Sequence, residues 1–208
     1  MYKKNHLIFS LAVCLILVSP DIQAQIKSGY IIGFNISNMN LKTSGTSFEA
    51  ETMTGIHVGV VSEIPLKGNF ILQSGIVFSA KGSIYKIDTT DVVISPIYME
   101  VPFNARYSIG SDFVKVFLFA GPYIACGVGG NKDTGGELKK VNFGADENDD
   151  LKFFDFGFYF GAGVNIKGFL ISAQYGLGLA NISPATSVYS EMKNKVIGIS
   201  LSSYFTGD

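Results

Sequence analysis

The chain has 208 residues, which suits a single domain, and its formal net charge of −1 excludes the concentrated basic face that nucleic-acid binding needs. Hydrophobic residues make up 47% of the chain and charged residues only 16%, and this hydrophobic fraction is high for a water-soluble protein. The 24 glycines, 17 phenylalanines and 10 tyrosines favour β-strands over helices.

Residues 1–24 have the pattern of a cleaved secretory signal peptide. Lys3 and Lys4 precede an apolar run at residues 7–18, and Ala24 ends a plausible cleavage site. The run is shorter than the roughly 20 apolar residues that a membrane helix needs, so we expect removal rather than a retained anchor. The mature domain would then be residues 25–208.

Eight segments after the signal have the composition and alternation of strands. They are residues 29–37, 54–64, 70–79, 97–108, 113–127, 152–166, 168–179 and 194–205. Four connections are long and polar, at residues 38–53, 80–96, 128–151 and 180–193, and they alternate with short turns at 65–69, 109–112 and 167–168. Short periplasmic turns, longer external loops and an even strand count are typical of membrane barrels, whereas a Greek-key sandwich would not keep this order. The sequence therefore predicts an all-β fold, an eight-stranded antiparallel up-and-down transmembrane β-barrel.

The two faces of each segment differ in polarity. In residues 154–166, Phe154, Phe156 and Phe160 share one face, and Asp155 lies among glycines on the other. The polar faces hold glycine, serine and single charged residues with almost no lysine, which favours an enclosed face and lipid contact for the apolar one. Residues 113–127 are apolar on both faces. A soluble periplasmic barrel that binds a small apolar ligand inside is the alternative.

Eight strands enclose a lumen just wide enough for side chains to fill, so we expect no diffusion pore. Because an unpaired buried charge is costly, the inward polar residues should form a structural network. Its predicted members are His57, Glu63, Gln73, Glu100, Arg106, Asp155 and Gln174. Aromatic residues next to the short turns should lie at the periplasmic membrane interface. They are Tyr30, Phe70, Tyr107, Phe169 and Phe205.

We predict no catalytic, cofactor-binding or metal-binding residues, and therefore no enzyme. His57 is the one histidine after residue 24, and no Gly-x-Ser-x-Gly motif accompanies it. His57 could act as a base oriented by Glu63 only if a serine joined them, so a lipid-modifying enzyme is a further alternative. The acidic run at residues 145–150 lacks the spacing of a calcium loop and indicates a solvated loop.

Several stretches resemble the PorT-type outer-membrane β-barrel family of Bacteroidota, and the resemblance covers nearly the whole mature chain. The stretches are GIHVGVVSEIPLKGNFILQSGIVFSAKGS (55–83), YMEVPFNARYSIG (98–110), FLFAGPYIACGVGG (117–130) and FDFGFYFGAGVNIKGFLISAQYGLGLANI (154–182).

The resemblance implies a protein of the cell outer membrane, surrounded by outer-membrane lipid and inserted by the barrel-assembly machinery. We expect a structural or interaction role, with partner or surface contacts through the four long external loops. One member of the family is linked to type IX protein secretion and gliding, and most have no assigned activity. Barrels of this kind commonly end at an aromatic residue, whereas Phe205 is followed here by Thr206, Gly207 and Asp208.

Overall fold

A computed structural model describes residues 26–43, 46–87, 90–111, 113–146, 149–184, 187 and 189–205. The strands are β1 (Lys27–Thr43), β2 (Thr46–Glu49), β3 (Glu51–Pro65), β4 (Phe70–Ala80), β5 (Ser83–Ile87), β6 (Thr90–Gly110), β7 (Val114–Thr134), β8 (Glu137–Lys140), β9 (Phe154–Ile166), β10 (Phe169–Gly178) and β11 (Glu191–Phe205). None of the described residues belongs to a helix long and apolar enough to cross a membrane. The predicted signal peptide and the three residues after Phe205 lie outside the described residues.

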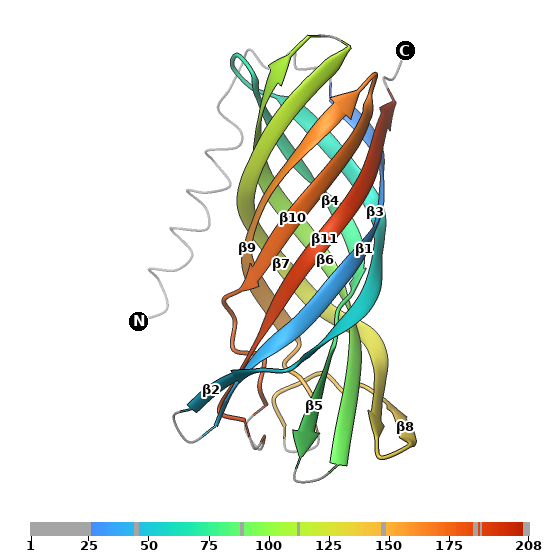
Figure 1. The fold of residues 1–208 in the computed structure, drawn as a ribbon, viewed down its shortest axis with the longest axis vertical. Helices are drawn as coiled ribbons and strands as arrows, with labels where there is room; N and C mark the ends of the chain where they lie inside the picture. The colour runs from blue at the N-terminus through green and yellow to red at the C-terminus, as the bar shows by residue number, and fades with distance from the viewer. Residues whose placement is uncertain are drawn as a thin grey trace, which may run out of the picture.

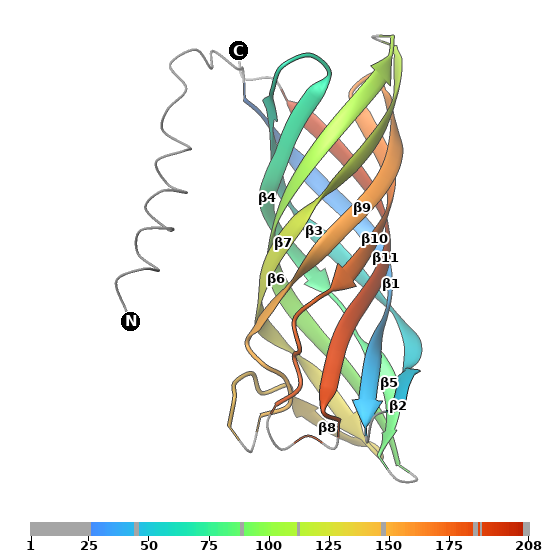
Figure 2. The ribbon, with the colours of Figure 1, turned by 90° about the vertical axis from the view of Figure 1, so that its left-hand side faces the viewer.

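Eight of the strands form a closed antiparallel ring. The order is β1–β3–β4–β6–β7–β9–β10–β11, and β11 pairs with β1 from Ser28↔Phe205 to Lys42↔Glu191. Figures 1 and 2 show the tilted strands closing around one axis. Closure matters because each unpaired backbone N–H or C=O in hydrocarbon costs several kcal/mol. The predicted eight-stranded up-and-down barrel is confirmed.

The two ends of the barrel differ. The three short turns lie at the upper end in Figure 1, with the end of β11, and β2, β5 and β8 lie at the lower end. By the usual geometry of such barrels the short turns face the periplasm and the lower end is external. The prediction that residues 38–53, 80–96 and 128–151 are loops was wrong in part. β1, β6 and β7 continue into these segments and pair there with β2, β5 and β8, because neighbouring strands still offer them hydrogen-bond partners.

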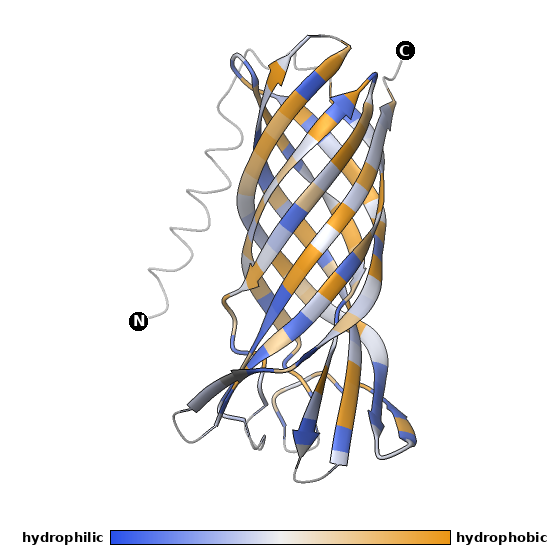
Figure 3. Cartoon of the chain, viewed as in Figure 1, coloured by the Kyte–Doolittle hydropathy of each residue, from blue (hydrophilic) through white to orange (hydrophobic). Residues whose placement is uncertain are grey.

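The outer surface of the ring is apolar. Phe154, Phe156 and Phe160 are 71%, 53% and 48% exposed, so they point away from the interior as predicted. Orange bands alternate with paler and blue ones along the strands in Figure 3. A belt of large exposed apolar side chains is the surface that lipid covers in a membrane barrel.

The strand whose faces the sequence left ambiguous, β7, places its aromatic rings inside. Phe117 and Phe119 are buried in the lumen, and they face glycines on the neighbouring strand β9. A Cβ at Gly161 would lie 2.2 Å from Phe119 Cζ, and one at Gly163 would lie 2.5 Å from Phe117 Cζ. The inward glycines of β9 therefore make room for rings in a narrow barrel.

The polarity of both faces inverts toward the external end. Along β1 the inward residues at the lipid level include the polar Asn35 and Ser37, and from Met39 onward they are apolar. The outward residues are apolar up to Ile36 and polar beyond it, as at Lys42. β11, which pairs with β1, changes in the same direction toward its external end. This inversion marks the level at which the surroundings of the barrel change from lipid to water.

Candidate functional site

A lysine in a segment that the sequence predicted as a loop lies buried inside the barrel. Lys81 directly follows β4, and its side chain turns into the barrel, where the residue is only 2% exposed. Its Nζ lies 2.6 Å from Glu100 Oε1 and 3.5 Å from Asp155 Oδ2. Tyr159 donates a hydrogen bond of 2.7 Å to Glu100 Oε2. One cation thus sits between two carboxylates that would be strongly destabilising if left unpaired.

Further groups hold the Asp155 carboxylate. Tyr123 donates to Asp155 Oδ2 at 3.2 Å, and Asn194 donates to the same oxygen at 3.0 Å. The Lys81 ammonium also lies over aromatic rings, 4.6 Å from the Tyr123 centroid and 5.2 Å from that of Tyr98. This network joins β6, β7, β9 and β11 across the lumen, so it stabilises the closed ring.

A second polar group lies nearer the periplasmic end. Arg106 Nη1 is 2.5 Å from Glu63 Oε1, and both side chains are buried. Gln73 donates to the hydroxyl of Tyr204 at 2.6 Å and accepts from Asn104 at 3.4 Å. These contacts pair the charges that the lumen encloses, as the energetics of buried ions require.

His57, on β3, lies in a hydrogen-bonded row with the neighbouring strand β1 and with β11, the strand beyond β1. Its Nδ1 is 2.8 Å from Asn35 Oδ1, and its Nε2 is 2.8 Å from Ser200 Oγ. The amide of Asn35 donates to Ser79 Oγ at 3.0 Å and to the carbonyl of Ala80 at 3.1 Å, which turns Oδ1 toward the ring. His57 Nδ1–H therefore donates to Asn35, and Nε2 accepts from the Ser200 hydroxyl.

This row has the order of a nucleophile, a base and an orienting group. The serine that the sequence could not identify is Ser200, and Asn35 takes the orienting place for which Glu63 was considered, since Glu63 pairs with Arg106. Ser200 is only 2% exposed, so the described part of the barrel leaves no room for a substrate at its hydroxyl. The row satisfies every polar atom of the buried imidazole.

The cavity beside these groups is small and polar. It has a volume of about 40 Å³, and its lining includes His57, Glu100, Asn104, Arg106 and Gln174. A space of this size holds a few water molecules. It does not fit an acyl chain or the small apolar ligand of a soluble barrel, which would need an enclosed apolar chamber.

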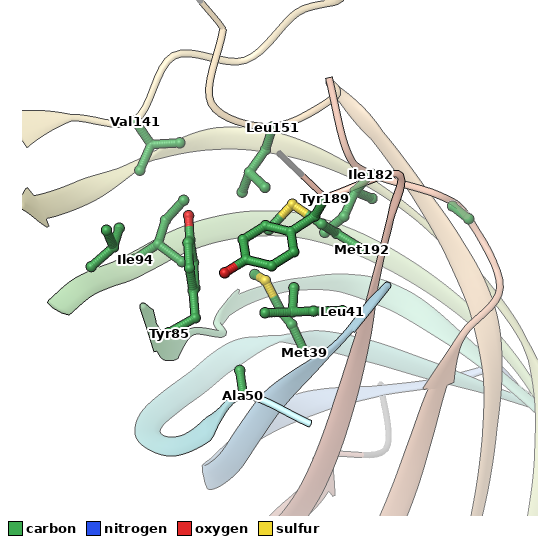
Figure 4. Packing of buried hydrophobic residues seen from close by; sticks show 12 residues of the cluster. Met39, Leu41, Ala50, Tyr85, Ile94, Val141, Leu151, Ile182, Tyr189 and Met192 are labelled. Carbon is green, nitrogen blue, oxygen red and sulfur yellow. The ribbon is translucent and has the colours of Figure 1, made fainter. Parts of the chain in front are cut away.

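Beyond the polar lumen, toward the outside of the cell, the external ends of the strands enclose apolar side chains, which we call the external apolar cluster. Its buried members are Met39, Leu41, Ala50, Tyr85, Val92, Ile94, Val141, Leu151, Ala180, Ile182, Tyr189 and Met192. Figure 4 shows these side chains converging from all four segments predicted as external loops. The rings of Tyr85 and Tyr189 meet edge to face at 5.5 Å, and burial raises the pKa of the Tyr85 phenol. The long connections therefore share one core, which was not expected from their polar sequences.

The acidic third loop is tied to the same region. Asp150 accepts a charged hydrogen bond of 2.7 Å from Lys132 and another of 2.9 Å from the backbone N–H of Asn142. The neighbouring Leu151 is fully buried in the external apolar cluster. Among the described residues, which omit 147 and 148, no group of three or more ligating side chains could hold a metal ion.

The predicted interface aromatics all lie exposed at the turn end of the barrel. Tyr30 and Phe205 have ring centroids 5.5 Å apart, and those of Phe70 and Tyr107 are 4.8 Å apart. Phe169 begins β10 just after the third short turn and is also exposed. These rings form a partial girdle at the level where a bilayer interface would meet the periplasm.

Of the seven predicted lumen residues, six make described polar contacts in the interior, and Gln174 lines the small cavity. Sequence reasoning missed Lys81, Asn35, Asn104, Asn194 and Ser200. The asparagines and the serine occupy inward positions of predicted strands, so their alternation was a signal. Lys81 had no such signal, because it follows the last residue of its strand.

The comparison with protein families agrees with this architecture. The sequence profile of the family described as "Outer membrane protein beta-barrel domain" matches residues 23–183. No curated protein matches the sequence.

Several solved structures are similar to the chain at low sequence identity. Ail, the attachment invasion locus protein of Yersinia pestis, is 14% identical with a TM-score of 0.43, over 87% of this chain and 99% of Ail. Neisserial surface protein A is 12% identical with a TM-score of 0.45, over 85% and 97%. The N-terminal β-barrel domain of Pseudomonas aeruginosa OprF is 8% identical with a TM-score of 0.38, over 84% and 97%.

Proposed function

Since the chain belongs to the outer membrane protein beta-barrel domain family and is a protein of the outer membrane, we propose that it is a PorT-type barrel of structural or interaction type. Its external segments would contact a partner or another surface, and its narrow lumen would not conduct solutes. Outer-membrane lipid would surround the belt, and the barrel-assembly machinery would insert the chain.

The external apolar cluster is the observation that carries this proposal. It joins residues from all four external segments, so their exposed faces form one ordered surface rather than four independent loops. Preorganised surfaces lose less conformational entropy when they bind. Leu138, in the hairpin of β7 and β8, is 68% exposed on this surface next to Lys139 and Lys140.

Site-specific photo-crosslinking in intact envelopes tests the interaction role. A crosslinker at Leu138 should yield a discrete adduct, while one at Ile32, which is exposed on the belt at the lipid level, should not. The folded barrel should also leave the envelope only with detergent and migrate faster on a gel before heating than after. Adduct patterns that are identical at Leu138 and Ile32 would contradict the proposal.

The structure of the lumen leads to a separate prediction about ion conduction. The paired network of Lys81, Glu100 and Asp155 lies across the interior, and the external apolar cluster covers it. The purified barrel in planar bilayers should therefore show no steady conductance. A stable open channel in the wild-type protein would refute the occluded lumen.

A role in lipid hydrolysis is the competing candidate, because Ser200, His57 and Asn35 lie in catalytic order. We propose that the row is structural, since the serine is buried and the surrounding strand backbone is engaged in the ladder. A serine-reactive fluorophosphonate should not label the folded protein in bilayers. Labelling that disappears in Ser200→Ala would establish an enzyme instead.

A further inference from the structure

An apolar groove runs along the outer wall of the barrel near its periplasmic end. It has a volume of about 550 Å³ and crosses β6, β7 and β9. The outward side chains that line it are Tyr107, Ile109, Val116, Leu118, Ala162 and Val164. The groove therefore lies in the lipid-facing belt, beside the periplasmic girdle.

The groove exists because the wall recedes at small residues. Ala162 of β9 stands opposite Leu118 of β7 on one side and Ala173 of β10 on the other. Leu118 is strongly exposed and projects from the wall, whereas Ala162, which lines the groove, leaves the surface beside Leu118 low. A linear hydrocarbon chain can fill such a depression and recover the dispersion contacts that the missing side chains do not make.

A cation is fixed where the groove meets the periplasmic interface. Lys167, in the turn after β9, donates its backbone N–H to the carbonyl of Phe113 at 3.2 Å. Its Nζ lies 4.7 Å from the centroid of the Phe113 ring, directly before the start of β7. Val116 and Val164, which line the groove and pair with each other, each lie three residues from this contact, Val116 after Phe113 and Val164 before Lys167. The order from bilayer to water is thus apolar groove, aromatic ring and ammonium.

We propose that this groove is a binding site for a phospholipid with an anionic headgroup. One acyl chain lies between Leu118 and Val164 over Ala162, and the phosphate contacts the ammonium of Lys167 beside Phe113. The sequence of apolar, interfacial and charged groups matches that of a single lipid molecule. The ammonium of Lys167 favours an anionic over a zwitterionic headgroup, because the amine of a zwitterionic headgroup repels it. The proposal is independent of the partner that the external surface binds.

The absence of tryptophan from the chain permits a clean fluorescence test. A single tryptophan replaces Phe113 at the mouth of the groove, and a control barrel carries Tyr30→Trp on β1, four strands away around the ring of eight. Each barrel is reconstituted in phosphatidylcholine vesicles with a minor fraction of brominated phosphatidylglycerol, which quenches nearby indole. Quenching at Phe113→Trp should indicate local enrichment of the anionic lipid about fivefold above that at Tyr30→Trp, the effect of one lysine at the membrane surface.

Two further variants in the Phe113→Trp barrel separate the headgroup from the chain. Lys167→Gln should lower the enrichment to the level of the Tyr30→Trp control. Ala162→Phe should reduce quenching by brominated phosphatidylcholine and phosphatidylglycerol alike because it fills the groove, while the matched exposed change Ala173→Phe should not. Folding of every variant is checked by heat-modifiable gel migration.

Three results would overturn the proposal. Equal quenching at the two reporters would show that the groove has no lipid preference. If the enrichment of anionic lipid is retained in Lys167→Gln, the proposed contact between the phosphate and Lys167 is wrong. Emission at Phe113→Trp that depends on the protein-to-lipid ratio, and not on the lipid composition, would assign the groove to a second copy of the chain.

Discussion

The interior of the barrel at the level of the lipid belt contrasts with the interior of its external extension, although the same strands build both. In the belt, β1 points Asn35 and Ser37 inward, and two strands across the ring supply Glu100 and Asp155 to Lys81. In the extension, β1 points Met39 inward to the external apolar cluster. The medium around the barrel explains the difference. At the lipid level the outward side chains must be apolar, so the polar side chains of each strand face inward. In water the outward side chains can be polar, and the apolar ones face inward.

The two regions are also stabilised by different interactions. The belt interior encloses charged and polar groups among buried aromatic rings such as Phe117, Phe119 and Tyr159, so its order depends on completed charge pairs and hydrogen bonds as well as on packing. The extension buries aliphatic and aromatic side chains as a water-soluble domain does, at about 25 cal/mol per Å². Removal of one side chain should therefore lower the stability by different amounts in the two regions and should destabilise different parts of the protein.

Removal of the Lys81 ammonium should have the largest effect, because it leaves Glu100 and Asp155 buried without their shared cation. We expect Lys81→Met to lower the free energy of unfolding by about 3–5 kcal/mol, measured by urea denaturation in detergent micelles. Lys139→Met, at an exposed lysine of β8, should change it by less than about 0.5 kcal/mol. A triple variant that adds Glu100→Gln and Asp155→Asn should recover part of the loss. If Lys81→Met unfolds at the wild-type midpoint, the network does not stabilise the ring.

A cavity in the external apolar cluster should weaken the extension and spare the barrel. Leu151→Ala removes a fully buried side chain, at an expected cost of about 2–5 kcal/mol in local stability. Proteolysis of the external segments should accelerate, while heat-modifiable migration of the barrel should stay as in the wild type. Leu138→Ala, at an exposed leucine, is the matched control. Loss of the folded barrel band in Leu151→Ala would show that the two regions unfold as one unit.

A lysine on the outer wall should be costly at one level and tolerated at the other. Ile199→Lys places a charge on the exposed apolar belt of β11 and should destabilise the protein by about 2–4 kcal/mol in vesicles. Asn40→Lys, at an outward position of β1 beyond the inversion, should cost less than about 0.5 kcal/mol. Similar penalties at the two positions would place both of them in the same medium.

The smallest expected effect concerns an exposed ion pair of the extension. A hydrogen bond from Lys195, together with its charge, lowers the pKa of the Glu49 carboxyl. A carboxyl whose pKa is lower in the folded state stabilises that state above its unfolded pKa, and this contribution disappears as pH falls through the folded value. Protection of the β1–β2 amides against hydrogen exchange, taken relative to the intrinsic exchange rate at each pH, should therefore decrease slightly in acid, and Glu49→Gln should remove that pH dependence. If the pH dependence of protection is unchanged in Glu49→Gln, groups other than Glu49 cause it.

The sequence by itself determined the barrel and the direction of its faces. Alternation with a period of two is local, so Phe154, Phe156 and Phe160 were assigned outward, and Glu100 and Asp155 inward, without knowledge of the strand pairing. The order of long and short connections, which is also read directly along the chain, predicted the up-and-down topology.

Only the tertiary structure decided which inward groups meet. Ser200 reaches His57 across 143 residues because β11 closes on β1, and Asn35 reaches it from β1 itself. Lys81 enters the lumen from the end of a strand, where alternation no longer predicts a direction. The external apolar cluster likewise depends on ring closure, since its residues come from four segments that the sequence presents as separate and polar. Contacts between distant strands follow from register and closure, and neither is encoded within a single segment.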